Sequence, residues 1–383
     1  MQAFVYDSRE SWEKTKGLKK IEIPEPVLDE KNHPIDSTWV IVRMLRAGVC
    51  GSDRGIWFRN AFRDNIFESL KRENKHVRIV GHELFGEIVE AGSGVKEKYG
   101  FQKGDLVSAE SHITCGKCYQ CKKGERHVCT DETILGIGIN GCFAEYIKLP
   151  GKVLWHTDTK KIPPEIACMQ EPFGNAVHAV TRVDVRAKRI AVLGCGPIGL
   201  MVVMIAKALG AKQIIAVDPN DSKLELAKSF GADQIFKTLR DPASGYDVEL
   251  VNKMLDVTEG VGPDIAIEMA GYVSSVNTAI KLVRRGGDVI LFGLKSGDFS
   301  IKEFDRMIVR GITLHSIIGR QIFKTWETTQ NLLEDTSNNI QKHLWEGLLK
   351  KGDKTVVSFK DATTESFEES LLAHPKIVIN YEK

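Results

Sequence analysis

Three short motifs that lie far apart in the chain predict a metal site. Cys50 begins the run Cys-Gly-Ser-Asp, His82 and Glu83 are adjacent, and Glu171 precedes a proline. Thiolate, imidazole and carboxylate groups together suit Zn²⁺, and a mixed set can release a weak ligand to admit a substrate. Bound zinc would lower the pKa of an alcohol hydroxyl. Taken alone, no motif is specific for a metal site. A single His-Glu pair, for example, is usually a surface or core feature without a role in metal binding.

Two residues beside Cys50 suit supporting roles in the same chemistry. Asp53 can accept the second N–H of a ligand histidine and so orient its ring. Ser52 carries a hydroxyl that can take the proton of the substrate alcohol and pass it on.

A glycine-rich turn follows the metal motifs and predicts a dinucleotide site. Gly194, Gly196 and Gly199 flank Pro197 and Ile198, after an apolar run and before a helical pattern. In that context the first glycine permits a tight turn, the second admits the pyrophosphate and the third allows close helix packing. The helix N-terminus favours the phosphate charge. The alternative is a purely structural turn.

The predicted cofactor is NAD rather than NADP. Asp218 ends the next apolar run, 24 positions after Gly194, and a carboxylate there accepts ribose hydroxyls. The same carboxylate would repel a 2′-phosphate, and no arginine follows closely, although Lys223 is near.

Four closely spaced cysteines predict a second zinc site in a small lobe at about residues 112–130. Cys115, Cys118, Cys121 and Cys129 are separated by two, two and seven residues. Four thiolates leave no open coordination position, so this ion should be structural. An iron–sulfur cluster is the chemical alternative. The isolated Cys142, Cys168 and Cys195 are expected to be small buried side chains.

Charge and hydropathy limit the partners of the chain. The 53 basic and 51 acidic residues give a net charge of +2, so no general attraction to nucleic acid or anionic membranes is expected. No apolar run approaches the length that spans a bilayer. The first residues, 1–6, do not resemble a secretion signal, and we expect a cytoplasmic protein.

Two domains are expected from 383 residues. Residues 1 to about 110 read as short strands and turns, and the first domain is expected to extend to residue 174. Residues 175–320 alternate apolar strands with helices, which is typical of a doubly wound parallel sheet. The last segment, 321–383, loses that alternation and is predicted to return to the first domain. The main expected strands are 39–44, 85–90, 141–147, 189–193, 213–218, 264–268 and 288–292, and the main expected helices are 198–209, 221–230 and 274–283.

These motifs together resemble the zinc-dependent medium-chain dehydrogenase family over essentially the whole chain. Gly81-His82-Glu83, followed by Gly86, Gly92 and Val95, is similar to the zinc signature of that family. Within the family the stretches 111–116, 171–178 and 319–326 are most similar to the threonine dehydrogenases.

The resemblance implies a GroES-like catalytic domain joined to a Rossmann domain, two zinc ions per subunit, NAD, and a homotetramer or homodimer. It implies that Cys50, His82, Glu83 and Glu171 surround the catalytic zinc. It also places His112 near the substrate, and it implies NAD contacts at four positions: Ile198, Lys223, Leu294 and Ile317.

Two departures from the family pattern concern the substrate side. The family usually has Cys-Gly-Thr-Asp-x-His, and its histidine continues the proton relay, whereas here that position is Gly55. The segment from Cys50 to His82 is also longer than expected, with aromatic and basic residues at 54–78. That stretch is either a substrate wall or a helix with an ordinary apolar face.

The predicted activity is oxidation of a secondary alcohol by NAD at zinc. Threonine or a related amino alcohol is the first substrate expected, and a polyol or sugar is the alternative. A non-catalytic protein that binds zinc and NAD is the alternative of another class.

Overall fold

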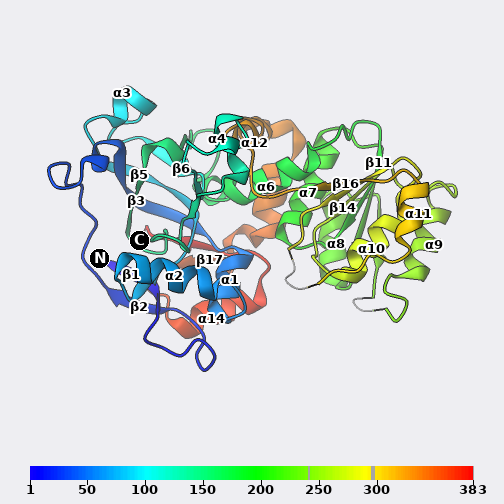
Figure 1. The fold of residues 1–383 in the computed structure, drawn as a ribbon, viewed down its shortest axis with the longest axis horizontal. Coiled ribbons are helices and arrows are strands. Elements are labelled where there is room, and N and C mark those ends of the chain that lie inside the picture. Colours follow the sequence, from blue (N-terminus) through cyan, green and yellow to red (C-terminus); the bar gives the residue numbers. More distant parts are fainter. Residues whose placement is uncertain (240–241, 295–297, 383) are drawn as a thin grey trace. The chain divides into compact units, whose positions relative to one another are not determined.

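The computed structural model describes residues 1–239, 242–294 and 298–382, and these form two compact units (Figure 1). One unit contains Met1–Pro172 and Leu344–Lys383, and the other contains Phe173–His343. The C-terminal segment thus belongs with the N-terminal unit. The domain boundaries predicted from the sequence follow residues 174 and 320. In the structure the chain divides after Pro172 and after His343, so residues 321–343 lie in the second unit.

The N-terminal unit is built on a seven-stranded sheet. Its strands follow the order β10-β6-β5-β3-β18-β17, and β9 also pairs with β3. These strands are β3 (Trp39–Gly48), β5 (Glu83–Ala91), β6 (Leu106–Ala109), β9 (Tyr146–Pro150), β10 (Leu154–His156), β17 (Val356–Ser358) and β18 (Val378–Asn380). A three-stranded sheet of β1 (Gln2–Asp7), β2 (Lys19–Glu22) and β4 (Val77–Ile79) and the pair β7 (His112–Ile113) with β8 (Thr133–Ile134) complete it.

Short helices cover this unit. They are η1 (Pro34–Thr38), α1 (Gly51–Trp57), α2 (Arg63–Glu73), α3 (Val95–Tyr99), α4 (Tyr119–Lys122), η2 (Arg126–Val128), η3 (Gly151–Val153), α5 (Pro164–Ala167), η6 (Lys350–Gly352) and α14 (Thr364–Ala373). Strand β3 is the centre of the unit because β5, β9 and β18 all pair with it.

The second unit holds a six-stranded sheet of parallel strands in the order β13-β12-β11-β14-β15-β16. Its strands are β11 (Arg189–Leu193), β12 (Gln213–Asp218), β13 (Gln234–Lys237), β14 (Ile265–Glu268), β15 (Asp288–Leu291) and β16 (Thr313–Ser316). Its helices are α7 (Pro197–Ala208), α8 (Asp221–Ser229), α9 (Val248–Asp256), α10 (Val273–Leu282), α11 (Phe304–Val309), α12 (Lys324–Glu334), η4 (Thr336–Asn338) and α13 (Ile340–Lys342). Two further helices, α6 (Gln170–Val180) and η5 (His343–Leu348), span the unit boundaries.

The strand order reverses between β11 and β14, so crossover helices leave the sheet centre in both directions. Helix α7 joins β11 to β12, and α10 joins β14 to β15; right-handed crossovers in opposite directions place these helices on opposite faces of the sheet. Residues Gly199–Ala206 of α7 are all buried, which explains why its sequence is apolar all round. This is the predicted doubly wound sheet.

One predicted strand is wrong in its extent. Residues 141–145 are irregular, and pairing with β3 begins only at Tyr146. The apolar pattern there reflects burial, with only an isolated bridge between Ala144 and Ala3 as strand pairing. Cys142 N donates to Gly81 O, and Phe143 packs in the core. A Cβ on Gly141 would come within 2.0 Å of Gly81 O, so the two segments touch through their backbones.

Candidate metal centres and nucleotide site

Three of the four residues predicted for the catalytic zinc converge in the N-terminal unit. Cys50 is the N-cap of α1, and His82 and Glu83 stand at the start of β5. One ligand atom from each of the three lies within 4.8 Å of the others. Glu83 pairs in register with Gly48 of β3, and a Cβ at Gly48 would come within 2.0 Å of Glu83 Oε2. A glycine at position 48 therefore makes room for the carboxylate.

Glu171 lies beside this group without being one of its three members. It begins helix α6, it is 3% exposed, and its Oε1 accepts a 2.7 Å hydrogen bond from Ser111 Oγ. Its negative charge acts on Glu83 and raises the pKa of that carboxyl further, in addition to the larger effect of burial. Glu171 is thus a near neighbour of the cluster.

Asp53 connects the cysteine to the histidine. Its Oδ2 accepts the Cys50 backbone N–H at 2.8 Å, and its Oδ1 is 3.5 Å from His82 Nδ1. Asp53 therefore lies beside the histidine that it is predicted to orient, and the orienting role itself stays a prediction. Ser52 is half-buried in the first turn of α1, one residue from Asp53.

The cluster fits a cation. Burial lowers the pKa of His82, but the negative charges of Asp53 and Cys50 outweigh burial, and the pKa lies well above its ordinary value. His82 Nδ1 and Glu83 Oε1 are buried atoms without a hydrogen-bond partner in the described part of the chain. A half-buried thiolate, a buried imidazole and a buried carboxylate form a donor set suited to Zn²⁺.

Lys376 is a functional neighbour that the motifs did not predict. Its ammonium group forms a buried ion pair with Glu83 Oε2, and it also donates to Val49 O at 3.2 Å. Lys376 is 2% exposed and Glu83 is fully buried. Burial lowers the pKa of Lys376, but Glu83 and other negative groups raise it above its usual value. The only sequence signal was a lysine at the start of the apolar run that becomes β18.

The four-cysteine lobe also gathers as predicted. The four Sγ atoms lie within 4.8 Å of one another. Backbone N–H groups point at the sulfurs: Cys121 N donates to Cys118 Sγ at 3.5 Å, and Cys115 N donates to Cys129 Sγ at 3.3 Å. Backbone donors lower the pKa of Cys118 to about 6, whereas burial raises that of Cys129 to about 12. All eight cysteines are free thiols.

The nucleotide turn has the predicted geometry. Gly194 has φ +102°, a conformation that glycine adopts readily. A Cβ on Gly199 would come within 1.9 Å of Gly194 O, whereas a Cβ on Gly196, the N-cap of α7, would meet nothing within 4 Å. Pro197 is the first residue of α7, Ile198 follows it, and Gly199 lets the helix approach the turn.

A hollow of about 250 Å³ lies at this turn, and its lining includes Gly194, Gly196, Asp218 and Lys223. Asp218 is 4% exposed; its Oδ2 accepts from Cys195 N at 2.8 Å and its Oδ1 from Asn220 N at 2.9 Å. These bonds fix the carboxylate at the end of β12, and its ribose-binding role stays a prediction.

Two predicted NAD contacts lie elsewhere in the second unit. Leu294 is 86% exposed after β15, and Ile317 is buried after β16 and donates its N–H to Leu291 O at 3.0 Å. Neither residue lines the 250 Å³ hollow. Both follow the carboxyl ends of parallel strands, the edge at which such sheets bind ligands.

His112 has a carboxylate partner. Its Nδ1 is 2.9 Å from Glu132 Oε2, and its backbone N–H donates to Glu110 at 2.9 Å. The preceding residue, Ser111, contacts Glu171. His112 is therefore one residue from a side chain that binds Glu171, the neighbour of the cluster. No sequence motif indicated its partner Glu132.

The stretch 54–78 forms most of α1 and all of α2, and both helices bury one face. This arrangement agrees with the prediction of a helix with an ordinary apolar face rather than a substrate wall. Arg54 donates to backbone carbonyls of Leu371, His374 and Pro375. Arg59 donates to Ile56 and Gly17 carbonyls. Both arginines hold neighbouring segments together.

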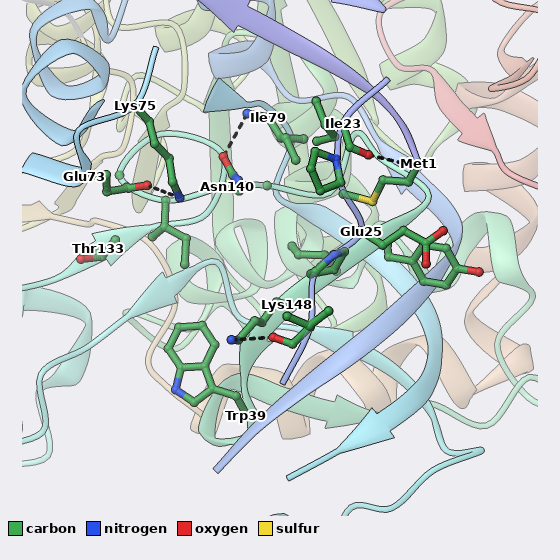
Figure 2. A pocket seen from close by; sticks show the side chains of 18 of the residues that line it. Met1, Ile23, Glu25, Trp39, Glu73, Lys75, Ile79, Thr133, Asn140 and Lys148 are labelled. Atoms are coloured by element: carbon green, nitrogen blue, oxygen red, sulfur yellow. Dashed lines mark hydrogen bonds and ion pairs between the residues drawn. The ribbon is translucent and has the colours of Figure 1, made fainter. Parts of the chain in front are cut away.

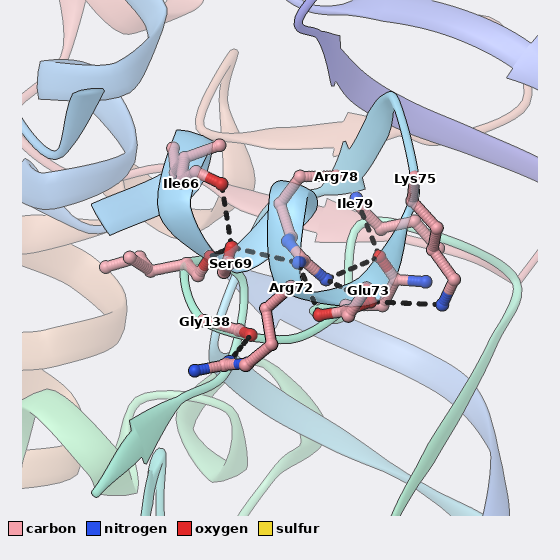
Figure 3. A network of polar contacts seen from close by, with 10 residues as sticks. Ile66, Ser69, Arg72, Glu73, Lys75, Arg78, Ile79 and Gly138 are labelled. Atoms are coloured by element: carbon pink, nitrogen blue, oxygen red, sulfur yellow. Dashed lines mark hydrogen bonds and ion pairs between the residues drawn. The ribbon is translucent and has the colours of Figure 1, made fainter. Parts of the chain in front are cut away.

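A buried polar network anchors the second helix of that stretch (Figure 3). Arg78 is fully buried and binds Glu73 at 2.6 Å, Ser69 at 3.0 Å and Asn140 at 3.2 Å. Ser69 in turn donates to Ile137 O. The network ties α2 to the loop before β9, so this stretch has a structural role.

Gly55 stands where the family resemblance leads us to expect a relay histidine, and a side chain at this position would be crowded. It lies in α1, and its carbonyl accepts the backbone N–H of Asn60 at 2.7 Å as the chain turns back. A Cβ on Gly55 would come within 2.9 Å of the Ala61 Cβ. The turn after α1 therefore closes against the position where the family histidine would stand.

A second hollow, of about 700 Å³, lies in the N-terminal unit (Figure 2). Trp39, Glu25, Lys75 and Lys148 line it, and Lys148 bonds to Val27 O at 2.9 Å. It shares no residue with either cysteine-containing cluster. Among the described helices, none has the length and apolar character needed to cross a membrane.

Comparison with known protein families defines the class. Residues 36–159 match the alcohol dehydrogenase GroES-like domain, and residues 197–335 match the zinc-binding dehydrogenase domain. The first match confirms the predicted GroES-like domain, and the second covers most of the parallel sheet. The molecule is a zinc-dependent oxidoreductase.

Individual proteins sharpen the assignment. The chain is 37% identical to L-threonine 3-dehydrogenase of Caldanaerobacter subterraneus subsp. tengcongensis over 83% of its own length and 84% of that protein. By structure it is similar to galactitol-1-phosphate dehydrogenase from Escherichia coli (TM-score 0.79, 24% identity, 99% of this chain and 100% of that one). It is also similar to a short chain alcohol dehydrogenase from Escherichia coli CFT073 complexed with NADH (TM-score 0.76, 24% identity, 100% and 99%). The chain belongs to the zinc-binding alcohol dehydrogenase family, which confirms the predicted family and supports the expected cofactors, zinc and NAD.

Proposed function

We propose that this enzyme oxidises a secondary alcohol with NAD, and that Cys50, His82 and a neighbouring carboxylate hold its catalytic zinc. The observation that carries the proposal is the convergence of the half-buried Cys50 with the buried His82 and Glu83, from two separate segments of the chain. Zinc bound there supplies Lewis-acid polarisation of the substrate hydroxyl. The nucleotide hollow of the second unit binds the NAD that accepts the hydride.

The side chains around the cluster divide the remaining work. Asp53, whose Oδ1 lies 3.5 Å from His82 Nδ1, orients the imidazole ring by its negative charge. Ser52 receives the proton of the alcohol. Because position 55 is a glycine, no side chain at that position passes the proton on to solvent. Lys376 holds Glu83 by an ion pair, so Glu171 is the carboxylate better placed to be the resting fourth ligand.

Threonine is the first substrate that we propose, on the 37% identity with an L-threonine 3-dehydrogenase. His112, oriented by Glu132, stands on the substrate side in this proposal. A polyol or sugar is the second candidate, because a galactitol-1-phosphate dehydrogenase shares the fold over the whole chain.

The test is a panel of alcohols with NAD and with NADP, with zinc measured on the same sample. L-threonine, sorbitol, xylitol, inositol and butane-2,3-diol are compared by the appearance of NADH absorbance. We expect two zinc ions per chain, NADH from L-threonine, and much weaker activity with NADP because Asp218 repels the 2′-phosphate. No turnover of any alcohol by a sample that binds zinc and NAD would favour the non-catalytic alternative.

We also propose a homo-oligomer, a dimer or a tetramer. Strand β16 is an edge of the parallel sheet, and unpaired edges are usually covered. Exposed apolar side chains lie close to it in sequence: Phe304, Ile308, Val309 and Ile318. Light scattering on the eluting protein gives the mass; a monomer would contradict the proposal. We keep the cytoplasm as the proposed location, in agreement with eight free cysteines.

A further inference from the structure

Glu268 is a buried carboxylate at the carboxyl edge of the parallel sheet. It ends β14, in register with Leu193 of β11 on one side and with Leu291 of β15 on the other. Its side chain is 0% exposed. No motif predicted a role for it, and neither the zinc clusters nor the glycine turn uses it.

The carboxylate binds the loop that follows its own strand. Glu268 Oε1 accepts the backbone N–H groups of Ala270 and Gly271, both at 2.9 Å. The main-chain carbonyl of Glu268 accepts from Phe292 and Gly293, at 3.0 and 3.2 Å. One residue therefore fixes the chain after β14 and the chain after β15.

The two loops touch so closely that only glycines fit. A Cβ on Gly293 would come within 2.1 Å of Gly271 N and within 2.7 Å of Glu268 Oε2. A Cβ on Gly194 would come within 2.9 Å of Ala270 N, so the nucleotide turn packs on the same loop. Met269 and Ala270 of that loop line the 250 Å³ hollow together with Gly194 and Asp218. The position of the hollow wall thus depends on Glu268.

The charge of Glu268 lacks a counter-ion. Its Oε2 has no hydrogen-bond partner, and no lysine or arginine forms an ion pair with it, within residues 1–239, 242–294 and 298–382. Burial raises the pKa of this carboxyl, while the Ser275 side chain and the backbone donors of Ala270, Gly271 and Gly293 favour its ionised form. Burying an unpaired charge costs free energy, so a ligand that supplies positive charge would relieve that cost.

The strand order indicates which half of the dinucleotide lies near Glu268. A dinucleotide crosses the carboxyl edge at the point where the strand order reverses, with one nucleotide on each half of the sheet. Asp218, on β12, belongs to the half that takes the adenosine ribose. Glu268, on β14, lies across β11 in the half left for the nicotinamide nucleotide. The nicotinamide ring is cationic in NAD⁺ and neutral in NADH.

We propose that Glu268 is a positioning residue of the dinucleotide site that also biases the site toward the oxidised cofactor. Its Oε1 fixes loop 269–271 against the glycine turn, and its negative charge stabilises NAD⁺ relative to NADH. The inference rests on the proposed NAD-dependent function.

Two variants separate these effects. Glu268→Gln keeps the shape and one acceptor oxygen but removes the charge. Glu268→Ala removes both. Glu249→Gln is the matched control, because Glu249 lies on α9 of the same unit with its side chain 76% exposed. Dissociation constants of NAD⁺ and NADH are measured by calorimetry on the zinc-loaded proteins, with KM for NAD and kcat measured beside them.

We expect Glu268→Gln to shift the ratio of the two dissociation constants toward NADH by about tenfold. We expect Glu268→Ala to weaken both cofactors by about tenfold and to raise KM for NAD more than it lowers kcat. The control should match the wild type. An unchanged ratio in Glu268→Gln overturns the charge effect, and unchanged affinities in a folded Glu268→Ala overturn the positioning role. Failure of the wild type to bind either cofactor would instead refute the proposed function, and so the two failures are distinguishable.

Discussion

The two metal-ligand clusters of the N-terminal unit differ in how the chain builds them. The four-cysteine cluster comes from one stretch of fifteen residues, 115–129, and its sulfurs receive hydrogen bonds from the backbone of that same stretch. The mixed cluster takes one side chain from the start of α1 and two from the start of β5. Lys376, near the C-terminus, supports it.

The two ways of building a metal-ligand cluster suit two different roles, stabilising a fold and carrying out a reaction. A local, all-thiolate cluster folds its own lobe around an ion and leaves no open position. A mixed cluster built from distant segments depends on the whole unit, and its carboxylates can exchange. We therefore expect substitutions in the mixed cluster to affect turnover most, and substitutions in the cysteine lobe to affect folding most.

The largest effect is expected for Cys50→Ala. Loss of the thiolate would remove one ligand of the proposed catalytic zinc, and kcat/KM should fall by about 10³-fold or more. Circular dichroism should stay unchanged and zinc content should fall toward one ion per chain. Full activity in this variant would mean that the mixed cluster is not the reaction centre.

Lys376→Met tests whether the mixed cluster depends on its distant support. The change leaves the Glu83 carboxylate buried without its partner, which should cost about 3–5 kcal/mol of unfolding free energy in urea. The control is Lys16→Met, since the Lys16 ammonium pairs with Glu368 at the surface and is 64% exposed. That variant should lose less than about 1 kcal/mol. Equal losses would show that the buried pair is not special.

Cys121→Ser should affect the cysteine lobe in the opposite way from Cys50→Ala. Cys121 is buried, and a hydroxyl cannot replace its thiolate at zinc. We expect about 2–3 kcal/mol of lost stability, read as a lower thermal midpoint, and loss of one zinc. Activity per folded molecule should fall much less than in Cys50→Ala. A greater loss of turnover than of stability would reverse the comparison.

Gly55→Ala should have the smallest effect. The added methyl presses on the Ala61 Cβ, so about 1 kcal/mol of stability should be lost in thermal melts. Turnover should stay within a few-fold of the wild type, because the chain has no relay side chain to lose there. A large drop in kcat without a change in stability would show that the space beside Gly55 carries the proton.

The sequence predicted most of what depends on local pattern. The glycine turn, Asp218 and the four cysteines were all found by spacing, and the strands 189–193 and 213–218 match β11 and β12 in full. Spacing succeeds there because a tight turn or a small lobe is formed by neighbouring residues. The region 141–145 failed because burial by loop packing produces the same apolar pattern as a strand.

Long-range partners could not be predicted in the same way. Lys376 lies 293 positions from Glu83 along the chain, and Glu132 lies 20 positions from His112. Glu268 resembled any acidic residue at the end of a strand. Each acquires its role only when the fold brings another segment to it, and pattern in one segment carries no information about that contact.

The contacts made by residues 371–376 have a consequence for biosynthesis. Arg54, in α1, binds carbonyl groups of Leu371, His374 and Pro375, and Lys376 neutralises Glu83. Proteins leave the ribosome N-terminus first, at about 5–20 residues per second. Cys50, His82 and Glu83 thus emerge long before the segment that locks them in place. A nascent chain can fill its cysteine lobe early, but the contacts of the mixed cluster are complete only after residues 371–376 have emerged.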